Sequence, residues 1–219
     1  DTKDGPFNDC GAFGSPNWLE FDPKYPHLVY VAADRGAGDE NEGNGNMRIL
    51  DLKNQYVGTA LTEGDMGGTN RGRALAFFDE NHMAVAVDQG DELRAAVYGF
   101  TRNREAPEGD ERNYKMWGNR LALVNFKACN TVTFHPVDGD MYFNSWDKGQ
   151  FFKVEKQQIQ EIFDGTRTTP ADKEVLFQMD NGWEYNIRIH PTGNYAYIVS
   201  INKHYIQRTN YDWASKRFV

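Results

Sequence analysis

The 219-residue chain is poor in cysteine and in long apolar runs, two features that often indicate a functional class. It contains two cysteines, Cys10 and Cys129, too few for a disulfide framework and without the spacing of zinc ligands. No apolar run approaches the ~20 residues of a membrane span, so we expect no transmembrane segment. The first residue is Asp1 rather than Met, which we interpret as a processed or cut piece. Its start therefore says nothing about the compartment in which the protein works.

Positive charge and catalytic motifs are also scarce. There are 24 Lys and Arg residues against 32 Asp and Glu, a net charge of −8. Nucleic-acid binding needs clustered Lys and Arg, so we expect no nucleic-acid partner, RNA included. We find no Ser-His-Asp set, Cys-His pair or HExxH motif. The glycine-rich residues 64–72 lead from one expected strand into another, whereas a phosphate-binding loop needs a helix N-terminus.

What the chain does have is a hairpin pattern that recurs. Residues 128–146 show period-two alternation, an Asp-Gly turn, and aromatic or β-branched residues on both sides of the turn. The same pattern recurs in residues 18–31, 74–87 and 185–199. The composition, 39% hydrophobic and 14% aromatic, is sufficient for one well-packed core. These observations predict an all-β fold.

The four copies align on one turn position. This position is occupied by Pro23, Glu80, Pro136 and Pro191, which are 57, 56 and 55 residues apart. Three columns around it stay apolar: Leu19, Ala76, Val132 and Ile187; Phe21, Phe78, Phe134 and Ile189; Tyr30, Val87, Phe143 and Ile198. Apolar columns at nearly constant spacing are the mark of an internal repeat. The two cysteines precede copies 1 and 3, which would not be neighbours in a ring, so we do not expect them to form a disulfide.

A repeat of about 55 residues with four short antiparallel strands is typical of a β-propeller blade. We therefore predict a single partial propeller domain over residues 1–219, with blades at about 1–63, 64–127, 128–180 and 181–219. The expected strands are 17–22, 28–33, 46–53, 55–62, 73–79, 82–88, 92–101, 120–126, 129–134, 140–146, 150–155, 174–179, 184–190, 195–201 and 204–210. We expect a short helix at 155–163, a loop at 1–16, and a last strand of blade 4 that is short or absent. Residues 102–119 form a long charged connection with Tyr114 and Trp117 near its end.

Both His135 and His190 stand directly before a proline at the same repeat position. The equivalent residues in the other copies are Asp22 and Asp79. Asp and His share the ability to accept hydrogen bonds from a turn backbone. We therefore interpret this position as a turn anchor and not as a catalytic histidine pair.

The sequence of the first blade contains short motifs that resemble those of a known family of repeat proteins. They are residues 4–7 (DGPF), 12–13 (AF), 15–17 (SPN), 21–23 (FDP), 31–34 (VAAD) and 46–49 (NMRI). In these motifs the chain resembles the NHL-repeat β-propellers. It looks closest to the branch found in cell-surface proteins of polysaccharide-using gut bacteria. Blade 2 keeps Val87-Asp88, and blades 3 and 4 keep the strand pattern alone.

The resemblance implies several properties that the residues alone do not. Rings of this family usually have six blades, which implies that about two blades lie outside this sequence. It also implies an attached N-terminal TIG-like domain outside this sequence and a secreted, periplasmic or outer-membrane surface location. The implied function is a non-catalytic binding or scaffold propeller without a cofactor, with a glycan or a protein as its partner.

We expect the binding site at the mouth of the central channel, where the loops entering the first strands meet. The residues expected there are Asn17, Trp18, Arg71, Arg73, Asn130, Trp146, Trp183, Glu184 and Asn186. Aromatic faces stack on sugar rings, and amide groups match sugar hydroxyls. A second interpretation stays open: Asn and Trp residues at strand ends can cap strands and pack blades together without any ligand.

The alternative function is a metal-dependent hydrolase similar to the lactonase propellers, with a divalent cation such as Ca²⁺ in the channel. Asn17, Asn130, Glu184 and Asn186 are placed to supply oxygen ligands, but Arg73 beside them would repel a cation. The acidic insertion at residues 35–46 is a further, weaker candidate for Ca²⁺. Its candidate ligands are Asp34, Asp39, Glu40 and Glu42. Their spacing does not match an EF-hand, so we favour a solvated acidic loop.

Overall fold

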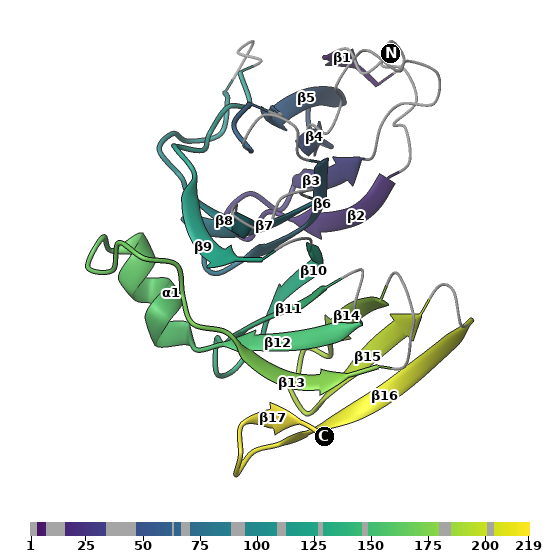
Figure 1. Cartoon of the computed structure of the whole chain (residues 1–219). Helices are drawn as coiled ribbons and strands as arrows, with labels where there is room; N and C mark the ends of the chain where they lie inside the picture. The colour runs from purple at the N-terminus through teal and green to yellow at the C-terminus, as the bar shows by residue number, and fades with distance from the viewer. Residues whose placement is uncertain are drawn as a thin grey trace.

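Four antiparallel sheets, one after another along the chain, make up the molecule. The computed structural model describes residues 4–7, 16–33, 47–62, 64–66, 71–88, 95–108, 113–126, 129–145, 149–179, 185–200 and 204–219. In each sheet, strands that follow one another in the sequence lie side by side. The four sheets follow an arc from the N-terminal to the C-terminal end (Figure 1). This is the arrangement of propeller blades, and the predicted all-β propeller class is confirmed.

Each blade starts with its innermost strand. Blade 1 holds β2 (Pro16–Phe21), β3 (Leu28–Ala33), β4 (Met47–Asp51) and β5 (Tyr56–Leu61), with β1 (Gly5–Pro6) at its outer edge. Blade 2 holds β6 (Arg71–Phe77), β7 (His82–Asp88), β8 (Ala95–Thr101) and β9 (Leu121–Asn125). Blade 3 holds β10 (Cys129–Phe134), β11 (Met141–Ser145), β12 (Gln150–Val154) and β13 (Glu174–Gln178). Blade 4 holds β14 (Tyr185–Ile189), β15 (Tyr195–Ser200), β16 (Tyr205–Asp212) and β17 (Arg217–Phe218).

The expected strands are confirmed, with ends that shift by a few residues. The last strand of blade 4, β17, is indeed short, with two residues. One expectation was wrong: residues 1–16 are not loop throughout, because Gly5 and Pro6 of β1 pair with Val57 and Tyr56. A two-residue strand has no periodicity from which it could be predicted. Its outer-edge position also tolerates proline, which has no N–H to donate.

Alternating apolar side chains form the core between the sheets. A large cluster joins blades 1, 2 and 3, with Tyr30, Phe100 and Phe143 among its fully buried members. A smaller cluster joins blades 3 and 4, where Tyr142 and Phe151 pack with residues such as Ile187. Blades are therefore held to their neighbours mainly by apolar contact between sheet faces, as expected for a propeller.

The turn-anchor interpretation of the four equivalent positions is confirmed. Each side chain accepts a hydrogen bond from a backbone N–H two or three residues further on. The pairs are Asp22 with Lys24 and Tyr25, Asp79 with Asn81, His135 with Asp138, and His190 with Thr192. Carboxylate and imidazole are exchangeable here because both accept a hydrogen bond at the same point of the turn.

The anchor of blade 1 also reaches blade 2. The Asp22 carboxylate accepts two hydrogen bonds from the Arg102 guanidinium, at 3.0 and 2.8 Å. The Tyr30 hydroxyl lies 3.2 Å from the same carboxylate. The side chains of Asp22 and Arg102 are almost completely buried. This ion pair therefore links the turn of blade 1 to the end of β8 in the interior of the protein.

The long connection after β8 returns to blade 1 before it enters β9. Its Tyr114 hydroxyl donates to Asp51 (2.7 Å), and its Trp117 indole N–H donates to the Tyr30 hydroxyl (3.0 Å). Burial acts to raise the pKa of the Asp51 carboxyl, but hydrogen bonds from Asn54 and Tyr114 outweigh it and hold that pKa below its ordinary value. The charged connection thus carries two aromatic side chains that pack blade 2 onto blade 1.

The other two contacts between blades use different chemistry. Between blades 2 and 3, the rings of Phe78 and Phe134 meet edge to face at 5.3 Å. Between blades 3 and 4, the buried His135 imidazole donates from Nε2 to the Gly193 carbonyl (2.9 Å) and stacks on Tyr211 at 4.2 Å. Gly193 has φ +75°, and a Cβ there would lie 2.7 Å from the His135 ring. Both the backbone conformation and the close approach of the ring require glycine at this position.

The expected short helix is confirmed as α1 (Lys156–Phe163). It belongs to the connection between β12 and β13 of blade 3 and packs against blade 2 near β9, where the rings of Phe163 and His82 lie 4.4 Å apart (Figure 1). Ile159 and Ile162 on one face are buried, and the Asp140 carboxylate accepts from the first helical N–H, that of Lys156 (2.8 Å). A carboxylate from a neighbouring turn therefore caps the helix, in place of a side chain next to it in sequence.

Candidate functional site

The innermost strands β2, β6, β10 and β14 bring polar side chains of different blades together. We call Trp18, Glu20, Asn130, Asn186 and Arg188 the inner-strand cluster. They come from blades 1, 3 and 4, and three of them were expected at the channel mouth. Propeller ligands are commonly bound where the first strands of several blades converge. This cluster is therefore the first candidate for a binding site.

Two of the predicted residues are in direct contact. The Asn130 amide N–H donates to the side-chain oxygen of Asn186 at 3.2 Å, although 56 residues separate them. Asn130 stands six residues before the turn position of blade 3, and Asn186 stands five residues before that of blade 4. Both lie near the start of the innermost strand of their blade, β10 and β14. Both side chains are half-buried. An amide pair of this kind combines donors and acceptors, which suits a ligand rich in hydroxyl groups.

Arg188 crosses from blade 4 to blade 1. Its guanidinium lies 3.5 Å from the centroid of the Trp18 ring and donates to the Glu20 carboxylate at 2.9 Å. It also donates to the Leu19 carbonyl at 3.2 Å. Arg188 is about half exposed and Glu20 about one-third exposed, so the pair is only partly screened from solvent. Stacking on indole fixes the plane of the guanidinium and leaves its edge able to bind planar or hydroxylated groups.

Trp18 is buried, and its role is partly structural. Its indole N–H donates to the Leu75 carbonyl of blade 2 at 2.8 Å. One face of the ring is covered by Arg188. Trp18 therefore packs blades 1 and 2 together and supports the guanidinium, and it does not offer a free ring face for a sugar.

The remaining predicted residues are placed as follows. Arg73 is half-buried in β6. Asn17 and Arg71 belong to β2 and β6, but their side chains lie outside the described part of the structure. The other predicted residues lie outside the described residues altogether: Trp146, Trp183, Glu184, Asp34, Asp39, Glu40 and Glu42. Glu20 and Arg188 were not predicted, although each stands two residues before the turn anchor of its blade, Asp22 or His190, and so occupies the same position of an equivalent strand.

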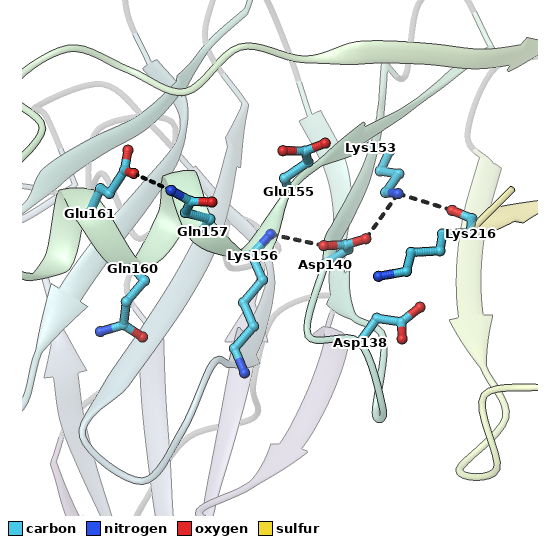
Figure 2. A pocket seen from close by; sticks show the side chains of 9 residues that line it. All are labelled: Asp138, Asp140, Lys153, Glu155, Lys156, Gln157, Gln160, Glu161 and Lys216. Atoms are coloured by element: carbon cyan, nitrogen blue, oxygen red, sulfur yellow. Dashed lines mark hydrogen bonds and ion pairs between the residues drawn. The ribbon is translucent and has the colours of Figure 1, made fainter. Parts of the chain in front are cut away.

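A second polar site lies on the opposite ends of the strands of blade 3. It is a pocket of about 580 Å³ between the turn after β10, the start of α1 and the turn before β17 (Figure 2). Its lining residues are Asp138, Asp140, Lys153, Glu155, Lys156, Gln157, Gln160, Glu161 and Lys216. No sequence motif marked this pocket, because its residues come from three separate segments.

Several charged groups of this pocket are already paired with other residues of the protein. Lys153 forms an ion pair with Asp140 at 2.9 Å and donates to the Lys216 carbonyl at 2.9 Å. Asp138 accepts from the Tyr211 hydroxyl. Burial and this hydrogen bond raise the pKa of Tyr211, so the phenol stays protonated and donates. Two of its carboxylates, Asp138 and Asp140, therefore already have partners within the protein, and the inner-strand cluster remains the better candidate.

We looked among the described residues for a reactive cysteine and for a cluster of metal-ligating side chains. The Cys129 thiol is free and buried, whereas Cys10 lies outside the described residues. Burial raises the pKa of Cys129 to about 12, which keeps it protonated and unreactive. Within the part of the chain that the structure describes, no three His, Cys, Asp or Glu side chains lie close enough together to hold a metal ion.

Comparison with known proteins gives matches among solved structures. No protein-family model and no curated protein sequence matches the chain. An auxiliary nutrient binding protein from Bacteroides thetaiotaomicron shares 33% identity and a TM-score of 0.75, over 100% of this chain and 44% of that protein. One from Bacteroides ovatus shares 26% identity and a TM-score of 0.73, over 100% and 44%. A Bacteroides thetaiotaomicron protein named as a candidate phosphatase shares 30% identity and a TM-score of 0.81, over 99% and 48%.

The chain therefore spans a little under half the length of these three proteins. The periplasmic gluconolactonase of Pseudomonas aeruginosa is more distant, with 10% identity and a TM-score of 0.56 over 93% of this chain and 55% of that protein. At this identity the likeness shows the propeller fold alone. Among the described residues, no helix is long and apolar enough to cross a membrane.

Proposed function

We propose that this chain is part of a non-catalytic propeller that binds a glycan as a nutrient ligand. The observation that carries the proposal is the inner-strand cluster, in which Arg188 and Glu20 pair across two blades beside the Asn130–Asn186 amide pair. Guanidinium, carboxylate and amide groups together match the alternating donors and acceptors of neighbouring sugar hydroxyls. The 33% identity to an auxiliary nutrient binding protein supports a binding role of this kind.

The location and the attached parts belong to the same proposal. The nutrient binding proteins similar to this chain come from Bacteroides. A propeller that captures glycans works where the glycans are, which favours a secreted, periplasmic or outer-membrane surface protein. A TIG-like domain before the propeller would fit this role, as the NHL-type motifs of blade 1 suggest.

The metal-dependent hydrolase has less support. Its cation would need the amide oxygen of Asn186, which accepts a hydrogen bond from Asn130. Arg73 also lies in an innermost strand, β6, and a guanidinium close to a divalent cation would repel it. Turnover of a lactone that disappears with a chelator and with Asn130→Ala would nevertheless establish the hydrolase and refute the non-catalytic proposal.

The binding proposal is tested with a panel of soluble polysaccharides and oligosaccharides. We expect at least one to bind in calorimetry. Arg188→Ala should weaken that binding by about tenfold to a hundredfold, because a hydrogen bond to a charged group contributes about 1.5–3 kcal/mol. Arg217→Ala is the matched control, since Arg217 is also half exposed and paired with a glutamate, Glu174, away from the cluster. The proposed site would be refuted if the folded protein bound none of the saccharides. It would also be refuted if Arg188→Ala and Arg217→Ala weakened the binding equally.

A further inference from the structure

Another pocket lies at one end of blade 1, between its turns and the long connection that follows β8. Its volume is about 630 Å³, within the range common for sites that bind small molecules. The turn between β2 and β3 contributes Tyr25 and His27, and the turn between β4 and β5 contributes Lys53. The Leu52 N–H of the second turn donates to the His27 carbonyl at 2.9 Å, so the two turns lie side by side. Residues 105–108 of the connection form the other wall.

Part of the lining is apolar and is held in place by the core. The Tyr25 ring and Ala106 pack against the large apolar cluster that joins blades 1, 2 and 3. Pro107, next to Ala106, is buried. The Lys24 ammonium pairs with the Glu105 carboxylate at 2.9 Å, which joins the first turn to the connection. Both walls are therefore fixed by contacts with the rest of the protein.

Several polar groups of the lining have no partner within the described part of the chain. Four side chains form neither a hydrogen bond nor an ion pair there: Tyr25, His27, Lys53 and Glu108. The Tyr25 and His27 rings are half-buried and meet edge to face, with centroids 6.2 Å apart. Lys53 and Glu108 are exposed. The ammonium can donate, the carboxylate can accept, and the hydroxyl and the imidazole can do both, so all four are available to a ligand.

The charges of the pocket are balanced, which favours an uncharged ligand. Glu105 is already paired with Lys24. The remaining lysine and glutamate of the lining, Lys53 and Glu108, carry opposite charges. A pocket lined by charges of one sign attracts ions of the other sign, and this lining has no such excess. The pocket thus combines an apolar part with free donors and acceptors of compensated charge.

We propose that this pocket is an additional binding site for a neutral saccharide unit. A sugar ring has apolar C–H groups on its faces and hydroxyl groups around its rim. The Arg102 guanidinium lies over the Tyr25 ring at 5.2 Å and covers one face of it, so the C–H groups of the sugar contact Ala106 and Pro107 instead. The hydroxyl groups exchange hydrogen bonds with the free donors and acceptors of the lining.

This site uses no residue of the inner-strand cluster, and its ligand class follows from its own lining. It therefore goes beyond the proposed function and does not depend on it. Where both sites bind one polysaccharide, the second contact becomes intramolecular, and the avidity exceeds the affinity of either site alone. A chain with two such sites would prefer long polysaccharides to short ones.

Nuclear magnetic resonance of the chain, isotopically labelled in its histidine and tyrosine side chains, tests the site. The probes are D-glucose, D-galactose, D-mannose and N-acetylglucosamine, with glucuronate as a charged comparison. We expect at least one neutral sugar to shift the ring signals of both His27 and Tyr25, which are assigned with His27→Gln and Tyr25→Phe. Lys53→Met should raise the dissociation constant measured from these shifts about tenfold, because it removes a charged donor.

Lys115→Met is the matched control for Lys53→Met. Lys115 is also exposed and belongs to the connection that forms one wall, but it does not line the pocket. The dissociation constant should therefore be the same with and without Lys115→Met. Because both lysines are exposed, neither substitution should disturb the fold.

Three results would overturn the proposed site. The first is that no neutral sugar shifts the signals of His27 and Tyr25, or that glucuronate alone does so. The second is that Lys53→Met and Lys115→Met change the dissociation constant equally. The third is a saccharide whose binding in calorimetry is lost with Arg188→Ala but which never shifts the His27 signals. That result would support the inner-strand cluster and overturn this pocket, so the two sites are tested separately.

Discussion

Removal of the Arg102 guanidinium should be among the most damaging single changes between blades 1 and 2. Arg102 donates to both oxygens of Asp22 and to the Glu80 carbonyl, and its guanidinium lies 4.5 Å from the Trp117 ring centroid. Arg102→Met keeps most of the apolar stem but leaves the Asp22 carboxylate buried without its counter-charge. The remaining partners of that carboxylate are two backbone amides and the Tyr30 hydroxyl.

The expected magnitude follows from this burial. Breaking a buried ion pair by removing one partner costs about 3–5 kcal/mol, because the other charge stays buried. The total free energy of unfolding of a domain is about 5–15 kcal/mol, so the loss is a large fraction of it. Replacing both residues, Asp22→Asn with Arg102→Met, removes both charges and should recover about half of the loss. The side-chain amide that Asp22→Asn introduces can still accept hydrogen bonds from the turn backbone.

Urea unfolding followed by far-ultraviolet circular dichroism measures these changes, and a double-mutant cycle isolates the coupling between the two residues. The control is Lys24→Met, since Lys24 and Glu105 form an exposed pair at 2.9 Å whose removal should cost less than about 1 kcal/mol. The reasoning would be refuted if Arg102→Met and Lys24→Met lowered the free energy of unfolding by the same amount within error. A double variant less stable than Arg102→Met alone would do the same.

Three further predictions concern single side chains. In a chain with Cys10→Ser, the Cys129 thiol should react with a disulfide reagent at pH 8 only as fast as the protein unfolds, because burial raises its pKa to about 12. The Asp51 carboxylate stabilises the fold above a pH of about 4, and this stabilisation should be lost as pH falls through its lowered pKa. Asp51→Asn should therefore make stability less dependent on pH in acid. Gly58→Ala should cost about 1–3 kcal/mol, since its Cβ would overlap the Tyr114 ring.

Each of these has a result that would contradict it. Rapid labelling of Cys129 in the folded chain, in the absence of denaturant, would show that the thiol is accessible. An acid transition that is the same with and without Asp51→Asn would assign the pH dependence to other groups. For the glycine, Gly64→Ala is the control, because the nearest atom to its added Cβ is 3.6 Å away. Equal melting temperatures of Gly58→Ala and Gly64→Ala would show that the Tyr114 ring moves away at little cost.

The repeat made most of the fold predictable. The period-two pattern located the strands, and the constant spacing of the turn columns identified the blades. The shared position of Asp22, Asp79, His135 and His190 gave the role of turn anchor, which the hydrogen bonds confirm. These features could be predicted because they are local: each depends on residues within one hairpin, and four copies repeat the same signal.

The site was less predictable because its contacts join distant segments. The pair of Asn130 and Asn186 was expected in one region, since both open equivalent strands. Arg188 and Glu20 were not, because 168 residues separate them and neither belongs to a motif. The contact depends on how far the arc of blades curves, which local periodicity does not encode. The strand at Gly5–Pro6 could not be predicted because two residues are too few to show any alternation.

The three junctions between blades have a consequence for how the chain reaches its native state. In a repeat protein, similar units can pair out of order or exchange between molecules. Here the first junction uses an ion pair at Asp22, the second an edge-to-face contact at Phe78, and the third a hydrogen bond from His135. A blade docked on the wrong neighbour would leave a buried charge or donor without its partner. The differences between the copies therefore discriminate against misassembly and domain swapping, although the copies share one architecture.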